Sequence, residues 1–289
     1  MRTFVLDSVG VLSYAGGLFI VAAGLTLVFG AMRLINIAHG SFYMLGAFLM
    51  TTIAGTSSGL RFWLALVAAT AVVAAIGAVA EVCVMQRIYA KEHLTQLLAT
   101  FALFLIIADV SLRAWGNQSR TVSVPGFADR KVQLAGATFP AYDLVIVAAA
   151  LLTGIGLWAL LTRTALGRQI RAAVEDPELL ASGGTNLRLL RTGVFVLGAA
   201  LAGLGGGVVA PQLAITPGMD AAIIVVAFIV TVIGGLGSIV GAALGALLIG
   251  LAQTLGTSYA PSWASSFTYL AMIAVLAVRP WGLLGTPER

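Results

Sequence analysis

Charged residues are scarce in this sequence: only 9% of its 289 residues are Asp, Glu, Lys or Arg, whereas 60% are hydrophobic. A soluble surface normally carries about a quarter charged residues, so this composition excludes a soluble globular protein. The mean hydropathy of +1.04 is instead typical of a polytopic membrane protein. The single cysteine, Cys83, lies inside an apolar run and allows no disulfide within the chain.

Catalytic and nucleotide-binding patterns are missing as well. The two lysines, Lys91 and Lys131, do not follow a glycine, so the sequence contains no P-loop. Two distant histidines and one cysteine give no metal-ligand spacing, and the GTSSG at 55–59 lies in a short predicted loop without the strand-turn-helix context of a nucleophile elbow. We therefore expect no enzyme, no metal and no cofactor. The basic residues form no stripe with aromatics, which argues against nucleic acid binding.

Apolar blocks fill most of the chain, and their lengths approach the roughly 20 residues that a helix needs to cross a bilayer. We predict an all-α polytopic membrane protein that forms a single transmembrane domain over residues 1–289, with about eight or nine crossings, some broken or re-entrant. The blocks are Val9–Met32, Leu34–Ala54, Phe62–Met85, Leu94–Ala114, Ala141–Leu161, Gly193–Ala210, Ala221–Ile233, Ile239–Leu255 and Ala264–Val278. The second block contains Asn36 and His39, and the seventh is short and ends in glycines.

The distribution of basic residues indicates an orientation. If the polar stretch Arg163–Arg191 is cytoplasmic, ten of the sixteen Lys and Arg residues lie on the inside, as the positive-inside rule favours. The longest external loop is then 116–140. With an odd number of crossings, the N-terminus is outside and the C-terminus is cytoplasmic.

Glycine is abundant, with 34 residues, most of them inside the predicted spans. Small residues four apart, such as Gly237, Gly241 and Gly245, allow close helix packing in lipid. The cluster Gly234, Gly235 and Gly237 interrupts an apolar run that is too long for one crossing. It predicts either a simple turn or a functionally broken helix.

Polar residues at membrane depth are costly and need a reason. For Glu81 we expect an ion pair with a basic side chain near the cytoplasmic face, such as Arg87, rather than a transport role. We expect Asp109 and Asp143 to be solvated near the outer helix ends. His39 shares a helix face with Asn36, and either a satisfied core histidine or a functional one fits this pattern.

The stretch Arg163–Arg191 is the only long polar interruption and carries five arginines. Asp176 followed by Pro177 predicts a helix start, with Glu178 in the first turn, and Gly183 and Gly184 predict its end. The result is a short helix flanked by arginines. A topogenic loop and a docking helix for a cytoplasmic partner both fit this pattern.

Three segments together resemble the LivH-type permeases of branched-chain amino acid ABC importers: LVFGAMRLINIAHGSFYMLGAF at 27–48, LGRQIRAAVEDPELLASGGTN at 166–186 and VIGGLGSIVGAALGALLIG at 232–250. The resemblance implies the ABC importer permease fold, alternating access, and a coupling helix at Glu178–Gly184 that docks on a separate ATPase subunit. Leu179 and Leu180 stand where that family has alanines. The resemblance also implies a periplasmic solute-binding protein and a second homologous permease subunit, in a heterodimer rather than a homodimer, in a bacterial inner membrane.

Two sets of candidate residues follow. For coupling to the ATPase they are Arg168, Arg171, Glu175, Asp176, Glu178, Gly183 and Gly184, and for the translocation pathway or a helix break they are Asn36, His39, Gly40, Gly234, Gly235 and Gly237. The expected cargo is a branched-chain amino acid or a related small polar solute such as urea or an amide. The alternative is an ion-coupled secondary transporter or channel, for which Glu81 is the central candidate. A membrane scaffold without transport is disfavoured by the glycine-broken spans.

Overall fold

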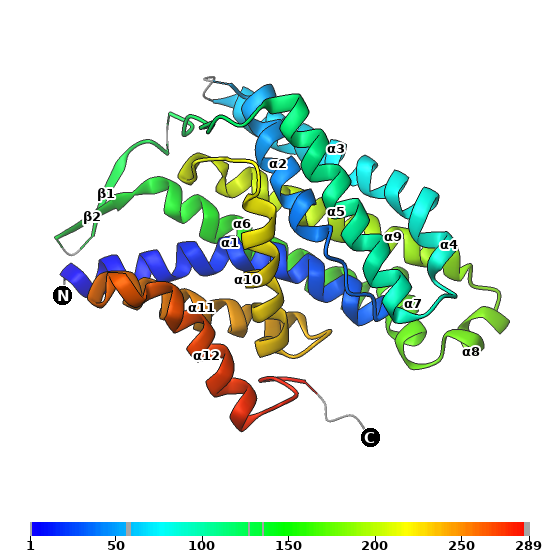
Figure 1. Cartoon of the computed structure of the whole chain (residues 1–289). Helices are drawn as coiled ribbons and strands as arrows, with labels where there is room; N and C mark the ends of the chain where they lie inside the picture. Colours follow the sequence, from blue (N-terminus) through cyan, green and yellow to red (C-terminus); the bar gives the residue numbers. More distant parts are fainter. Residues whose placement is uncertain (1, 56–58, 127, 135, 286–289) are drawn as a thin grey trace.

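The computed structural model describes residues 2–55, 59–126, 128–134 and 136–285, and these form a helical bundle (Figure 1). Its helices are α1 (Arg2–Met32), α2 (His39–Ile53), α3 (Leu60–Ala80), α4 (Gln86–Ile88), α5 (His93–Trp115), α6 (Ala141–Arg163), α7 (Ala165–Glu175), α8 (Pro177–Ser182), α9 (Leu187–Val209), α10 (Met219–Gly234), α11 (Ile239–Tyr259) and α12 (Ala264–Val278). A π-helical turn, Glu81–Met85, joins α3 to α4, and 3-10 turns lie at Ala210–Gln212 and Pro261–Trp263. The architecture is the all-α membrane permease that the sequence predicts.

Helix α1 is the centre of the bundle. Within its apolar span, Val5–Met32, 78% of an 18-residue apolar stretch is buried in the protein, the highest share among the candidate spans of the described chain. It packs against α6, α9, α10 and α11. A helix that is apolar all round suits this position, because other helices rather than lipid cover most of its circumference.

The predicted crossings correspond to helices in order, but they differ in length. By length and composition, six described helices can cross a membrane. Three others are shorter: α2 has 15 residues, α10 has 16 and α12 has 15, so each extends only about 22–24 Å, less than the ~30 Å hydrocarbon core. The prediction of a helix over Leu34–Ala54 is wrong at its start, since residues 34–38 are not helical.

The two ends of the bundle differ. The predicted loop 116–140 contains an antiparallel hairpin of β1 (Lys131–Leu134) and β2 (Ala137–Pro140), in which Lys131 lies opposite Pro140. The hydrophobicity pattern did not predict this hairpin. It lies at the same end as the N-terminus, whereas α7 and α8 lie at the opposite end (Figure 1).

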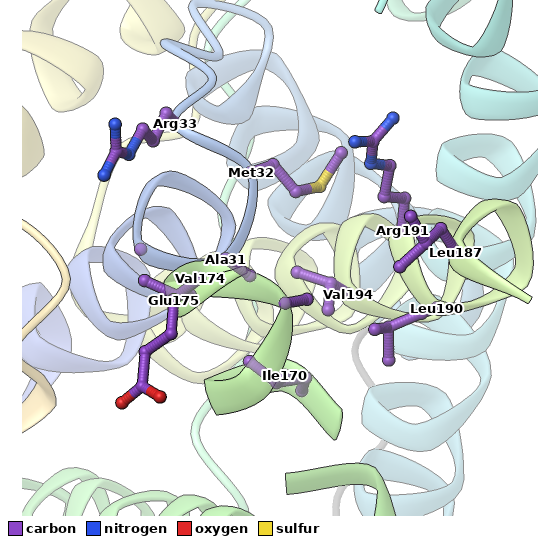
Figure 2. A pocket seen from close by; sticks show the side chains of 12 residues that line it. Ala31, Met32, Arg33, Ile170, Val174, Glu175, Leu187, Leu190, Arg191 and Val194 are labelled. Carbon is purple, nitrogen blue, oxygen red and sulfur yellow. The ribbon is translucent and has the colours of Figure 1, made fainter. Parts of the chain in front are cut away.

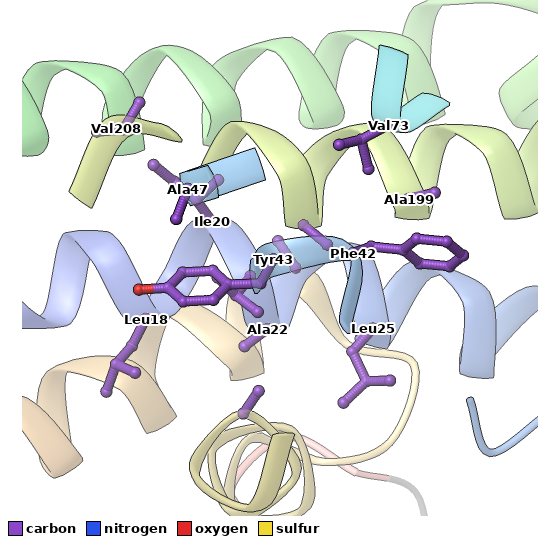
Figure 3. Close-up of a cluster of buried hydrophobic side chains, with 14 of the residues drawn as sticks. Leu18, Ile20, Ala22, Leu25, Phe42, Tyr43, Ala47, Val73, Ala199 and Val208 are labelled. Atoms are coloured by element: carbon purple, nitrogen blue, oxygen red, sulfur yellow. The ribbon is translucent and has the colours of Figure 1, made fainter. Parts of the chain in front are cut away.

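Small residues hold the buried helices together. Side chains from α1, α2, α3 and α9, among them Ile20, Phe42, Val73 and Ala199, form one buried cluster (Figure 3). Gly46 on α2 lies against the backbone of Gly203, and Gly206 on α9 lies against the carbonyl of Tyr43. Neither position leaves space for a Cβ, so α2 and α9 are in backbone contact, as dispersion-driven packing in lipid requires.

Candidate functional site

The α7–α8 segment at the polar end of the bundle begins with a tight corner. Thr164 caps α7, because its hydroxyl accepts a hydrogen bond from the Gly167 amide at 3.1 Å. Gly167 lies against the carbonyls of Leu160 and Leu161, and Arg171 donates to the Leu161 carbonyl. Helix α7 was not predicted separately; it is amphipathic, with Gly167 and Ile170 buried and Arg168 and Arg171 exposed.

Helix α8 has the boundaries that the sequence predicts. The Asp176 carboxylate accepts a hydrogen bond from the Leu179 amide at 2.9 Å, as an N-cap does. At the other end, Gly184 has a φ of 85°, a conformation that favours glycine. Glu175, Asp176, Gly183 and Gly184 are exposed, whereas the side chain of Glu178 lies outside the described part of the chain.

Two exposed leucines lie at the polar end of the bundle, one in this segment and one in the helix that follows it. Leu179 on α8 is 69% exposed and Leu189 on α9 is 70% exposed. Leu179 follows Glu178 in the sequence, and Leu189 follows Arg188. Single exposed apolar side chains are common, so these two leucines indicate an interface only together with the exposed helix α8.

A hollow of about 270 Å³ lies behind α7, between the end of α1 and the start of α9. Apolar side chains line most of it, and Arg33, Glu175 and Arg191 lie at its edge (Figure 2). Arg33 has a φ of 50° and is the only non-glycine residue with positive φ in the described chain. Part of the predicted coupling segment therefore lies at the same hollow as Arg33, a residue that the sequence did not indicate as a candidate.

The second candidate region lies deep in the bundle, where residues 33–38 replace the first part of the predicted second helix. Irregular backbone at membrane depth needs partners in the protein. Thr100 of α5 provides them: its hydroxyl accepts from the Ile37 amide at 3.3 Å, and its one proton is shared between the carbonyl of Ile35 at 3.2 Å and that of Leu97 in its own helix at 3.0 Å. Neither a proline nor a glycine causes the break in the helix. The hydrophobicity pattern therefore did not show how far the break extends.

His39 and Asn36 are both buried, with exposures of 0% and 2%. The His39 Nε2 atom lies 2.9 Å from the carbonyl of Val21, near the middle of α1. Among the described residues, neither His39 Nδ1 nor Asn36 Oδ1 has a hydrogen-bond partner. These two residues therefore lie inside the helix packing and carry unsatisfied polar atoms.

The first turns of the two short helices α2 and α10 meet at this depth. Gly40 lies against the backbone carbonyl of Asp220, and the Ser41 hydroxyl donates to the Asp220 carboxylate at 3.1 Å. Asp220 is only 1% exposed, and the described residues supply no cation to it. We call Gly40, Ser41 and Asp220 the α2–α10 junction. Sequence reasoning missed Asp220, although the T-P-G-M-D pattern before an apolar run is a helix-start signal.

Glu81 lies at the π-helical turn and has neutral partners, so the predicted ion pair is wrong. Its carboxylate accepts hydrogen bonds from Thr192 at 2.8 Å, Gln86 at 3.0 Å and Tyr89 at 3.2 Å. Arg87 donates instead to the Cys83 carbonyl. Burial raises the pKa of Tyr89, and the nearby Glu81 carboxylate raises it further. The cluster connects α3 and α4 to the start of α9.

The glycines at 234–237 form the turn between α10 and α11. Gly235 and Gly237 have φ values of 100° and 87°, and Gly234 packs on the backbone of Gly241. The sequence left two alternatives for these glycines, a simple turn and a functionally broken helix, and the structure contains the turn. It lies at the end of two antiparallel helices, away from the α2–α10 junction.

The outer aspartates differ from each other. Asp109 is exposed and pairs with Arg113 at 2.7 Å, whereas Asp143 accepts hydrogen bonds from Ser13 at 2.9 Å and Gln212 at 2.7 Å. No group of three or more His, Cys, Asp or Glu residues in the described ranges could hold a metal ion.

Comparison with known proteins agrees with this geometry. A family model described as "Branched-chain amino acid transport system / permease component" matches residues 8–276. The branched-chain amino acid permease BraD of Pseudomonas aeruginosa is 29% identical over 281 residues, which cover 93% of this chain and 92% of BraD. LivH of Escherichia coli K12 is 28% identical over 293 residues, with 93% and 91% covered.

A more distant relative has another cargo in its name. The fructose import permease FrcC of Rhizobium meliloti is 28% identical over 189 residues, which cover 62% of this chain and 51% of FrcC. No solved structure matches the chain.

Proposed function

Because the chain belongs to the branched-chain amino acid transport permease family, we propose that it moves branched-chain amino acids inward across a bacterial inner membrane. In this proposal, ATP is hydrolysed by a separate ATPase subunit, since the sequence contains no P-loop. A periplasmic binding protein delivers the amino acid at the hairpin end. A second, homologous permease subunit completes the pathway.

The observation that carries the proposal is the exposed α7–α8 segment at the end opposite the hairpin. Its capped helix, its arginines Arg168 and Arg171 and its exposed Leu179 offer a rigid, accessible surface. A motor protein that binds this surface can transmit its movement through α7 to α1 and α9, which both pack against α7. The N-terminus is then periplasmic and the C-terminus cytoplasmic.

The α2–α10 junction and its neighbours Asn36 and His39 are the proposed moving part of the translocation pathway. Two short helices whose first turns meet at membrane depth can separate without breaking a continuous helix, and unwound segments of this kind line transport sites in other membrane proteins. The turn at Gly234, Gly235 and Gly237 provides the cytoplasmic end of α10. Alternating access would follow from movement of α10 against α2.

Reconstitution tests the proposal. The chain, its partner permease and the ATPase subunit are placed in liposomes with a leucine-loaded binding protein, and uptake of labelled leucine is measured. We expect uptake to require both ATP and the binding protein. Uptake that an ion gradient drives without ATP would contradict the proposal and favour an ion-coupled transporter.

A matched pair of variants tests the coupling role of the α7–α8 segment. Gly184→Ala and Gly116→Ala both place a side chain at an open position of positive φ, 85° and 75°, with no atom within 4 Å of the new Cβ. Gly116 has a ψ of −175°, a conformation that only glycine adopts readily, so the control substitution is itself strained. Gly184 lies at the α8 end of the bundle and Gly116 lies at the hairpin end. We expect only Gly184→Ala to reduce the amount of ATPase subunit that co-purifies. An equal loss of ATPase subunit in both variants would contradict the docking role.

A further inference from the structure

The hollow between α1, α7 and α9 has no part in the transport scheme above, yet it has the features of a small ligand site. Its volume is about 270 Å³, just below the range of about 300–1,000 Å³ in which most ligand pockets fall. This size suits a ligand as small as one amino acid. Apolar side chains of Met32, Ile170, Val174, Leu190 and Val194 line it.

Charges of both signs lie at the edge of the hollow. Figure 2 shows Arg191 and Glu175 on opposite sides of it, with Ile170 and Val194 between them. Arg191 also lies over the ring of Tyr89, with 5.3 Å between the guanidinium carbon and the ring centroid, which fixes its position. Among the described residues, the side chains of Arg33 and Glu175 have no hydrogen-bond or ion-pair partner, so both are available to a ligand.

The backbone around the hollow adds to this polarity. The hollow lies at the C-terminal ends of α1 and α7 and at the first turns of α9. Helix C-termini favour a cation and helix N-termini favour an anion. At the end of α1, Arg33 itself supplies the cation. The end of α7 beside Glu175 therefore favours an ammonium group, and the Arg191 side favours a carboxylate.

Arg33 gives an independent reason to connect this place with function. It follows the last residue of α1 at a φ of 50°, where glycine is the favoured residue. A strained non-glycine residue that the fold does not require is found more often at functional sites than elsewhere. Arg33 lies at the edge of the hollow, so its cation is the feature that a glycine at this position would lack.

We propose that this hollow is a cytoplasmic binding site for a free α-amino acid with a branched aliphatic side chain, and that its occupancy slows the transporter. The carboxylate lies toward Arg191 and Arg33, the ammonium toward Glu175, and the aliphatic group contacts the apolar lining. The ligand is the solute that the proposed function releases on this side, so the inference rests on that function. A ligand that bridges α7 to α1 and α9 stabilises the present position of α7 and opposes its movement.

The experiment uses the complete transporter in liposomes with the ATPase subunits facing outward. Binding protein and leucine at a saturating concentration are enclosed inside, and leucine is then added outside while ATP hydrolysis is measured. We expect millimolar external leucine to reduce hydrolysis by about 5-fold or more, the lower end of typical allosteric couplings. The α-keto acid of leucine, which lacks the ammonium group, and isopentylamine, which lacks the carboxylate, should each act at least about 10-fold more weakly.

Three variants complete the test. Arg33→Gly removes a cation at a position where the backbone favours glycine, so misfolding cannot explain its effect, and Val174→Phe fills the hollow from a half-exposed position. Lys91→Gln removes an exposed cation that does not line the hollow and is the charge control. We expect Arg33→Gly and Val174→Phe to abolish inhibition by external leucine, and Lys91→Gln to keep it.

The outcomes separate this inference from the proposed function. If leucine is transported but external leucine has no effect, or inhibits wild type and Val174→Phe equally, the inference is wrong and the proposed function stands. If leucine is not transported at all, the proposed function is wrong, and the inference, which rests on it, is wrong with it.

Discussion

The α2–α10 junction and the α7–α8 segment are both candidate functional regions, but they hold their residues in opposite ways. At the junction and the neighbouring α2–α9 contact, backbones touch and polar groups are enclosed: Asp220 is 1% exposed, and Gly206 has no space for a Cβ. In the α7–α8 segment, Asp176 and Leu179 are exposed and the caps are local. Residues of the first region therefore contribute to stability, whereas those of the second lie at an exposed surface.

The largest difference should come from a glycine of the α2–α9 contact. Gly206→Ala would place a methyl group against the Tyr43 carbonyl, and overpacking of this kind costs about 3 kcal/mol. We expect a clear fall in the melting temperature of the detergent-solubilised protein. Gly193→Ala is the control on the same helix, since nothing lies within 4 Å of its Cβ, and it should be neutral or stabilising by up to about 1 kcal/mol.

The next effect concerns the polar contact within the junction. Ser41→Ala removes one of the hydrogen-bond donors to the buried Asp220 carboxylate, and loss of a hydrogen bond to a charged group costs about 2 kcal/mol. We expect a lower melting temperature and slower leucine uptake. Thr162→Ala on the surface of α6 loses only a bond to its own helix, at Trp158, and should leave both measurements unchanged. Equal effects of the two substitutions would remove the distinction between junction and surface.

A smaller effect is expected where α5 supports the unwound segment. Thr100→Val keeps the shape of the side chain but removes its bonds to the backbone of Ile35 and Ile37, at a cost of about 1 kcal/mol. Because Thr100 supports only this segment, we expect faster hydrogen exchange at the Ile37 amide with little change at α9. Unchanged exchange at Ile37 would show that Thr100 does not hold the break.

The smallest effect on stability should come from the exposed segment. Asp176→Ala removes the cap of α8, which costs about 1 kcal/mol in the helix itself. Since α8 is short and exposed, we expect no measurable change in the melting temperature but a marked loss of ATPase binding in co-purification. A fall in melting temperature as large as that of Gly206→Ala would contradict the contrast between the two regions.

Much of the fold could be predicted because lipid imposes a simple rule on composition. Apolar blocks of sufficient length become helices, so α1, α3, α5, α6, α9 and α11 lie where the sequence predicts them. The cap and stop of α8 were also predictable, since Asp176 and Gly184 act on their own backbone neighbours. The roles of these residues in coupling stay predictions.

Other features depended on contacts between distant parts of the chain. The Glu81 pairing was wrong because neutral donors satisfy its carboxylate, among them Thr192, which is 111 residues away, while the nearby Arg87 turns to its own helix. The unwound segment at 33–38 was not evident, since its support comes from Thr100 on another helix. The β1–β2 hairpin lacked a clear alternating pattern.

The sequence by itself determined that this protein lies in a membrane, that it is helical, and that one long polar segment interrupts its apolar blocks. These properties follow from hydrophobicity and local backbone preference, which act over one or two helical turns. Only the tertiary structure decided that α2 and α10 meet at Gly40 and Asp220, and that Arg33, Glu175 and Arg191 surround one hollow. These groups are brought together by helix packing, and a single sequence carries no direct signal of which helix faces lie against each other.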